Sequence, residues 1–225
     1  GFTASGTSSS YQVKNCYAIT NIDVEINSIT SDDIYINGFV RYHDYVTICY
    51  VNSNIMYNIH NQTSTGTVNI GNFSSYITTK TDNYVVDNSI TNTGSIAATN
   101  TYKGSTYYNV LNAYQFRNGY VCNHLNNYTL SPFYQTLYSD PYPVLDNTHQ
   151  PIYYVRGIYY NIIYCISLYD HIVAFNTILK SGYTYENEIV EVLRSVSCSG
   201  YKLTPSTTAF KGTFKGNNYT ISNFY

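Results

Sequence analysis

The 225-residue chain has no tryptophan, one methionine and five prolines, and only 11% of its residues are charged. An average soluble domain carries roughly 25% charged residues, so neutral side chains must form most of the polar surface here. The formal net charge is −2, and Lys and Arg do not cluster, which argues against a nucleic-acid partner. The sequence has no run of about 18 apolar residues, so we expect no membrane-spanning helix.

Tyrosine is the residue in excess, with 29 copies. Its ring favours strands, and its hydroxyl keeps one end of the side chain polar. Asparagine is also frequent, and it tolerates the left-handed backbone of tight turns. This composition predicts an all-β protein with many short strands.

One phrase occurs twice, first as KNCYAITNI at positions 14–22 and again as TICYVNSNI at positions 47–55. In both copies small or apolar residues occupy every second position, which is the pattern of a strand with one buried face. We therefore expect Cys16 and Cys49 to point inwards and Tyr17 and Tyr50 to point outwards. Looser copies of the phrase surround the remaining cysteines, which are Cys122, Cys165 and Cys198.

The other candidate strands are short and are separated by turn-forming residues. They are 34–40, 45–51, 67–70, 84–87, 107–112, 152–155, 159–169 and 217–225. Residues 131–152 hold four of the five prolines and predict a long irregular loop, because proline lacks the N–H that a strand donates. Near 186–196 the apolar spacing favours one short helix, although the alternation of Val190 and Val192 would also fit a strand.

The C-terminal segment TAFKGTFKGNNYTISNFY resembles the phrase that opens GLUG-motif repeats in large surface and secreted proteins. The matching residues are Phe210, Gly212, Phe214, Gly216, Asn217, Ile221, Asn223 and Phe224. Segments 36–55 and 94–112 are similar to the body of such a repeat. The resemblance implies a right-handed parallel β-helix (a β-solenoid), in which each coil adds one strand to two or three parallel sheets. We expect residues 1–225 to form a single domain of this kind, as one unit of a longer repeat array or filament.

The five cysteines fit such a fold as packed thiols, because free cysteine behaves as a small buried apolar residue. The expected core ladder comprises Cys16, Cys49, Cys122, Cys165 and Cys198. The sequence contains no CxxC and no paired Cys/His motif, so we expect no metal site and no cofactor. A disulfide between some pair is the alternative, although an odd number of cysteines leaves one thiol over.

The two ends of the sequence fit an end-to-end arrangement. If the C-terminal segment TISNFY of one copy is followed by the N-terminal segment GFTASG of the next, the two together read as an uninterrupted repeat. We therefore expect the stacking interface at Gly1, Phe2, Phe224 and Tyr225. Units that contact head to tail without closing form filaments. We therefore expect a structural, fibre-forming protein of the extracellular space or cell surface, with copies of itself as its partner.

The sequence indicates two possible roles for glycans, as covalently attached groups and as bound ligands. Four Asn-x-Ser/Thr sequons are candidate N-glycosylation sites, at Asn61, Asn72, Asn127 and Asn218. Rows of outward tyrosine rings could also bind glycans, so the alternative function is a glycan- or host-surface-binding adhesin module.

Catalysis is not expected. Polysaccharide lyases and hydrolases need clustered carboxylates, and the 13 acidic residues of this chain are spread along its length. We therefore assign no catalytic residue and expect the protein not to be an enzyme. A degenerate polysaccharide-active enzyme is the third alternative.

Overall fold

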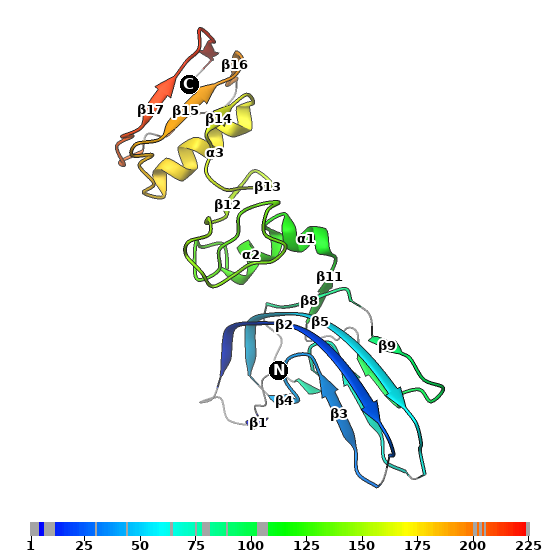
Figure 1. Ribbon diagram of the computed structural model, residues 1–225. Coiled ribbons are helices and arrows are strands. Elements are labelled where there is room, and N and C mark those ends of the chain that lie inside the picture. The colour runs from blue at the N-terminus through cyan, green and yellow to red at the C-terminus, as the bar shows by residue number, and fades with distance from the viewer. Residues whose placement is uncertain are drawn as a thin grey trace. The chain divides into compact units, whose positions relative to one another are not determined.

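The structure is a computed structural model that describes the chain except residues 1–4, 7–11, 30, 44, 64, 75, 78–81, 89, 103–107, 200, 201, 203, 205, 224 and 225. The chain divides into two compact units, Gly1–Phe116 (unit 1) and Arg117–Tyr225 (unit 2) (Figure 1). Strands dominate the described residues, which contain three short helices. The prediction of an all-β protein is therefore confirmed only in its coarser form, as a β-rich fold.

Unit 1 consists of sheets whose strands come from successive stretches of the chain. The first sheet has the order β11–β8–β5–β2, with β9 also paired to β5. Its strands are β2 (Val13–Ile26), β5 (Val46–Ile59), β8 (Asn83–Val86), β9 (Ile90–Asn92) and β11 (Asn109–Leu111). The other two sheets have the orders β10–β6–β3 and β1–β4–β7. Their strands are β1 (Ser5–Gly6), β3 (Ile34–Asn37), β4 (Tyr42–His43), β6 (Val68–Gly71), β7 (Tyr76–Ile77) and β10 (Asn100–Tyr102). All pairings between these described strands are parallel.

The strand register in unit 1 repeats along the chain. Cys16 lies opposite Cys49 in the first sheet, and Ile34 lies opposite Val68 in the second, so both pairs are separated by nearly the same length of chain. One repeat further along, Cys49 lies opposite Asn83. Equivalent positions therefore stack on one another, and the two copies of the repeated phrase occupy the same place in consecutive layers.

Equivalent residues of consecutive layers also stack at the corners of the backbone and in the core. Asn15 and Ile48 are both left-handed, with φ of 54° and 57°, so consecutive layers bend at the same point. Inside the stack, Phe39, Phe73 and Tyr108 form a column at intervals close to one repeat. The ring centroids of Phe39 and Phe73 are 5.0 Å apart, and those of Phe73 and Tyr108 are 5.3 Å apart. Aromatic residues that lie about one repeat apart in the sequence therefore pack against each other in the core.

Unit 2 combines short strands with helices. Helix α1 (Ala113–Arg117) ends at the first residue of this unit, and α2 (Tyr120–Leu125) follows. Strands β12 (Tyr153–Val155) and β13 (Ile158–Tyr160) form an antiparallel hairpin. Helix α3 (Tyr169–Lys180) packs on a core shared with the parallel strands β14 (Cys165–Ile166) and β15 (Ile189–Val192). Strand β17 (Thr213–Lys215) pairs with β15 in the same parallel sheet. Strands β16 (Val196–Ser197) and β18 (Ile221–Ser222) form a further parallel pair.

Two expectations for this half of the chain can be compared with the structure. Residues 131–152 form the predicted irregular loop, in which an isolated bridge joins Tyr134 to Val144. The short helix expected near 186–196 was wrong, because β15 occupies that segment. Val190 and Val192 are buried on one face of β15, so the alternating pattern prevails over the helical spacing.

Candidate functional site

At one end of the unit 1 stack, the inward face of β2 is only partly covered. The inward side chains of β2 are partly exposed, whereas those of β5 directly opposite are buried. The partly exposed and buried partners are Cys16 with Cys49, Ala18 with Val51, Thr20 with Ser53, Ile22 with Ile55, and Val24 with Tyr57. We call this set of β2 side chains the end face.

The same end presents a strand edge. Among the described residues, β1, β2 and β3 are each the outermost strand of their sheet. The carbonyl of Ile26 accepts a hydrogen bond from the His60 N–H at 2.9 Å, so even-numbered residues of β2 bond towards β5. The odd-numbered residues from 17 to 25 therefore direct their backbone groups towards the open edge. The interface residues expected from the sequence, Gly1, Phe2, Phe224 and Tyr225, lie outside the described residues.

Polar side chains link one layer of the stack to the next. Asn54 donates to the Oδ1 of Asn21 at 3.1 Å, and these residues hold equivalent positions in the repeated phrase. Asp33 accepts from the hydroxyl and the backbone N–H of Thr67, at 2.6 and 2.9 Å. Both bonds, the hydroxyl bond first, lower the pKa of the Asp33 carboxyl from its ordinary value. These contacts hold layers in register, which is a structural role.

The five cysteines do not form a single ladder. Cys16 and Cys49 lie opposite each other in β2 and β5, as the repeated phrase predicted. Cys122 is buried in α2, Cys165 is exposed in β14, and Cys198 is buried just after β16. The expected five-member ladder was wrong, because Cys122 lies on a helix and Cys165 lies at the surface. All five residues are free thiols.

Tyr50 does not face solvent. Its ring stacks on Tyr17, with centroids 5.2 Å apart and 6° between the ring planes, and lies 5.6 Å from the ring of Phe116. The outward orientation expected for Tyr50 is therefore not accompanied by exposure, because Phe116 on α1 covers this part of β5.

The sequon asparagines differ in exposure. Asn61, Asn127 and Asn218 are exposed. Asn72 is 1% exposed, and its side-chain amide donates to the Asn88 carbonyl at 3.2 Å. Asn72 cannot carry a glycan in this fold, so the prediction at that position was wrong.

Unit 2 carries a group of aromatic side chains that the sequence interpretation did not find. Tyr120 and His124 lie on α2, Tyr128 follows it, and Tyr154 and Tyr159 are paired across the β12–β13 hairpin. Each ring contacts the next in a closed circuit. The centroid distances are 4.0 Å for Tyr120–His124, 5.1 Å for His124–Tyr128, 6.2 Å for Tyr128–Tyr154, 5.0 Å for Tyr154–Tyr159 and 6.3 Å for Tyr159–Tyr120. We call these residues the aromatic cluster. The four-residue spacing of the first three is the sequence signal that could have revealed it.

Hydrogen bonds hold both ring nitrogens of His124 and the hydroxyl of Tyr128 in the aromatic cluster. The Nδ1 of His124 lies 2.8 Å from the Tyr120 carbonyl oxygen, and its Nε2 lies 3.2 Å from the Tyr128 hydroxyl. Burial, followed by the neighbouring hydroxyls of Tyr154, Tyr120 and Tyr128, raises the pKa of Tyr159 to about 12. Tyr159 therefore keeps its proton at neutral pH.

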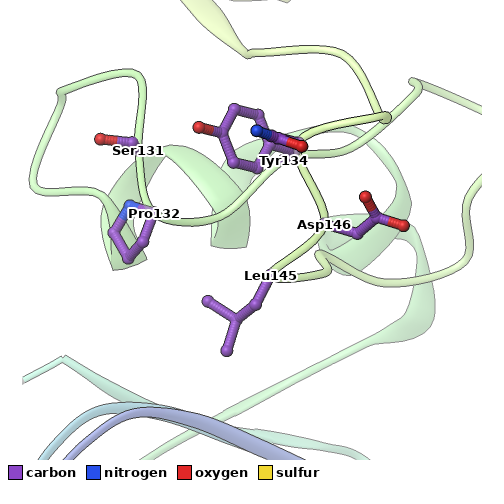
Figure 2. Close-up of a pocket in the computed structure, with 6 residues that line it drawn as sticks. Ser131, Pro132, Tyr134, Leu145 and Asp146 are labelled. Carbon is purple, nitrogen blue, oxygen red and sulfur yellow. The ribbon is translucent and has the colours of Figure 1, made fainter.

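The Pro-rich loop contains a hollow of about 470 Å³. Figure 2 shows its side chains coming from two neighbouring runs of the loop, with Pro132 and Tyr134 on one and Leu145 and Asp146 on the other. The Asp146 carboxylate accepts from the Thr148 N–H at 2.9 Å, and this bond lowers its pKa. Such a carboxylate is a poor general acid, because it holds its proton only at low pH.

A smaller hollow, of about 270 Å³, lies beside the aromatic cluster. Tyr128 and Tyr154 of the cluster line it, together with Asn123. Within the described part of the chain, no group of three His, Cys, Asp or Glu side chains could hold a metal ion.

Comparisons of the chain with protein-family models, with curated proteins and with solved structures found no match. No helix in the described ranges is long and apolar enough to cross a membrane.

Proposed function

We propose that this protein is a structural module of the cell surface or extracellular space, built as a parallel β-helix of the GLUG-repeat type that stacks head to tail with copies of itself. The nearly constant register offset between paired strands, as in Cys16 with Cys49 and Ile34 with Val68, supports a coiled chain with one repeat per layer. The resemblance of residues 208–225 to the GLUG opening phrase supports the family. Three of the sequon asparagines are exposed, which supports an extracellular location.

The end face is the observation that carries this proposal. In a stacked-layer protein each layer buries its inward side chains only against the layers next to it. The inward residues of β5 are buried because β2 covers them, whereas those of β2 remain partly exposed. A further layer would bury this apolar surface, at about 25 cal/mol per Å², and would pair the open β2 edge. A second copy of the chain is the partner with matching strand spacing.

The test compares two identical substitutions on β2. Ile22 belongs to the end face, whereas Ile19 is 54% exposed on the opposite face of the same strand. We expect Ile22→Lys to convert wild-type assemblies to monomers, because it places a charge in the contact surface. Ile19→Lys adds the same charge on the solvent side of β2, outside the end face, and should weaken assembly much less than Ile22→Lys. Light scattering coupled to size-exclusion chromatography measures the mass, and negative-stain microscopy of the wild type should show filaments.

Three results would count against the proposal. The first is a wild-type protein that stays monomeric at a concentration of about 100 μM, well above the Kd of a stable contact. The second is a closed dimer, because head-to-tail contacts do not close after two copies. The third is an equal loss of assembly in both variants. Circular dichroism melts of the two variants show whether Ile22→Lys remains folded.

A further inference from the structure

The aromatic cluster offers exposed ring faces on the surface of unit 2. The side chains of Tyr128 and Tyr154 are 60% and 47% exposed, although each contacts other rings of the cluster. The circuit of ring contacts fixes the orientation of these faces before any ligand arrives. A pre-ordered ring loses little conformational entropy on binding, which favours its use as a recognition surface.

The hollow beside these rings is lined mainly by apolar surface, with a few hydroxyl and amide groups and no charged side chain. Its lining includes the hydroxyl residues Thr177 and Ser181 and the amide residue Asn123, together with apolar and tyrosine side chains. An ionic ligand would find no counter-charge there, whereas a neutral ligand with hydroxyl groups would find donors and acceptors.

Asn123 provides an independent indication of a missing partner. Its side chain lines the hollow and is 2% exposed, yet its Oδ1 has no hydrogen-bond partner. A buried amide oxygen left unpaired is costly, so such a group in a folded protein calls for an explanation. A hydroxyl donated by a bound ligand would satisfy it.

We propose that the aromatic cluster and the adjoining hollow form a binding site for a neutral saccharide, with a pyranose ring stacked on Tyr154 and Tyr128 and a sugar hydroxyl bonded to Asn123. The C–H face of a pyranose packs on an aromatic face, while its hydroxyls need uncharged donors and acceptors. The hollow of about 270 Å³ lies just below the usual range of ligand pockets, which is roughly 300–1,000 Å³, so it suits a single sugar ring. This site is separate from the end face and does not depend on self-assembly.

The experiment uses the full chain and the methyl β-glycosides of glucose, galactose, mannose and N-acetylglucosamine. Saturation-transfer NMR should show transfer to at least one of them, and titration should give a Kd of about 1 mM, as expected for a ligand of this size. Glucuronate serves as the charged comparison and should bind more weakly than the best neutral glycoside.

Three variants locate the site. We expect Tyr154→Ala and Asn123→Leu each to weaken binding about tenfold. Asn123→Leu removes a buried amide oxygen that has no partner, so it should not lower the Tm, and its loss of binding cannot be attributed to unfolding. Tyr219→Ala is the matched control, because Tyr219 is 46% exposed on the same unit but lies outside the cluster. Absence of transfer from every neutral glycoside, tighter binding of glucuronate, or equal effects of Tyr154→Ala and Tyr219→Ala would overturn the proposal.

Discussion

At the scale of single residues, the five cysteines should differ widely in reactivity. Cys165 is exposed, whereas Cys49 and Cys122 are buried. Burial raises the pKa of the Cys49 thiol to about 12 and also raises the pKa of Cys122. Because the thiolate is the nucleophile, we expect iodoacetamide at about pH 8 to alkylate Cys165 first in the folded protein. Peptide mass spectrometry over a time course measures the order.

The unfolded protein is the control for this prediction. In denaturant all five thiols should react at similar rates, since burial no longer suppresses ionisation. Cys165→Ser should remove the fast phase from the folded protein. Labelling of Cys49 as rapidly as Cys165 would show that the core of unit 1 is not packed as described.

The repeated phrase predicted some residue positions and not others. It correctly placed Cys16 opposite Cys49, because a strand register carries every equivalent residue with it. It could not show that Tyr50 is buried, since the covering ring of Phe116 comes from a distant part of the sequence. It also could not show that Asn72 is buried, because a sequon says nothing about packing.

At the scale of elements, helix α3 begins without a capping side chain. Its N-cap is Leu168, which has extended backbone angles and makes no side-chain bond to the first turn. Ser, Thr, Asp and Asn are preferred there, because their oxygens accept from backbone N–H groups that lack helical partners. We expect Leu168→Ser to stabilise unit 2 by about 1 kcal/mol, measured as a rise in Tm or in the denaturant midpoint.

Leu193→Ser is the matched control for the capping prediction. Leu168 and Leu193 are both 46% exposed, but Leu193 follows β15 and caps no helix. Its replacement should change the Tm very little. A similar rise in both variants would mean that removing an exposed leucine, rather than adding a cap, is the cause.

The same missing cap explains why the sequence did not predict α3. The expected strand 159–169 runs up to the start of this helix, and Leu168 carries none of the features that mark a helix N-terminus. Near 186–196 the opposite error occurred, because helical spacing and strand alternation coexist there. Pairing of β15 with β14 and β17 makes this segment a strand, and a long-range pairing of this kind is not visible in a local sequence pattern.

At the scale of the whole molecule, the repeat pattern describes unit 1 better than unit 2. In unit 1 nearly the same register offset recurs from one strand pair to the next, so a periodic sequence predicts the parallel layers. Unit 2 also has parallel pairs, such as β15 with β17, but it adds α2, α3 and the Pro-rich loop. The aromatic cluster forms where α2 packs against the β12–β13 hairpin, and a sequence repeat does not predict that contact.

Each unit has its own apolar core, which leads to a prediction about unfolding. Val51 lies in the core of unit 1 and Val190 in that of unit 2, and both are 0% exposed. Removing two methyl groups from either site should cost about 2 kcal/mol, a shift of roughly 10 °C in Tm for a unit of this size. We expect calorimetry of the full chain to show two transitions, with Val51→Ala lowering the Tm of one and Val190→Ala lowering the Tm of the other.

The two substitutions are chemically identical, so each serves as the control for the other. A single transition that both variants lower equally would mean that the two cores unfold as one cooperative body.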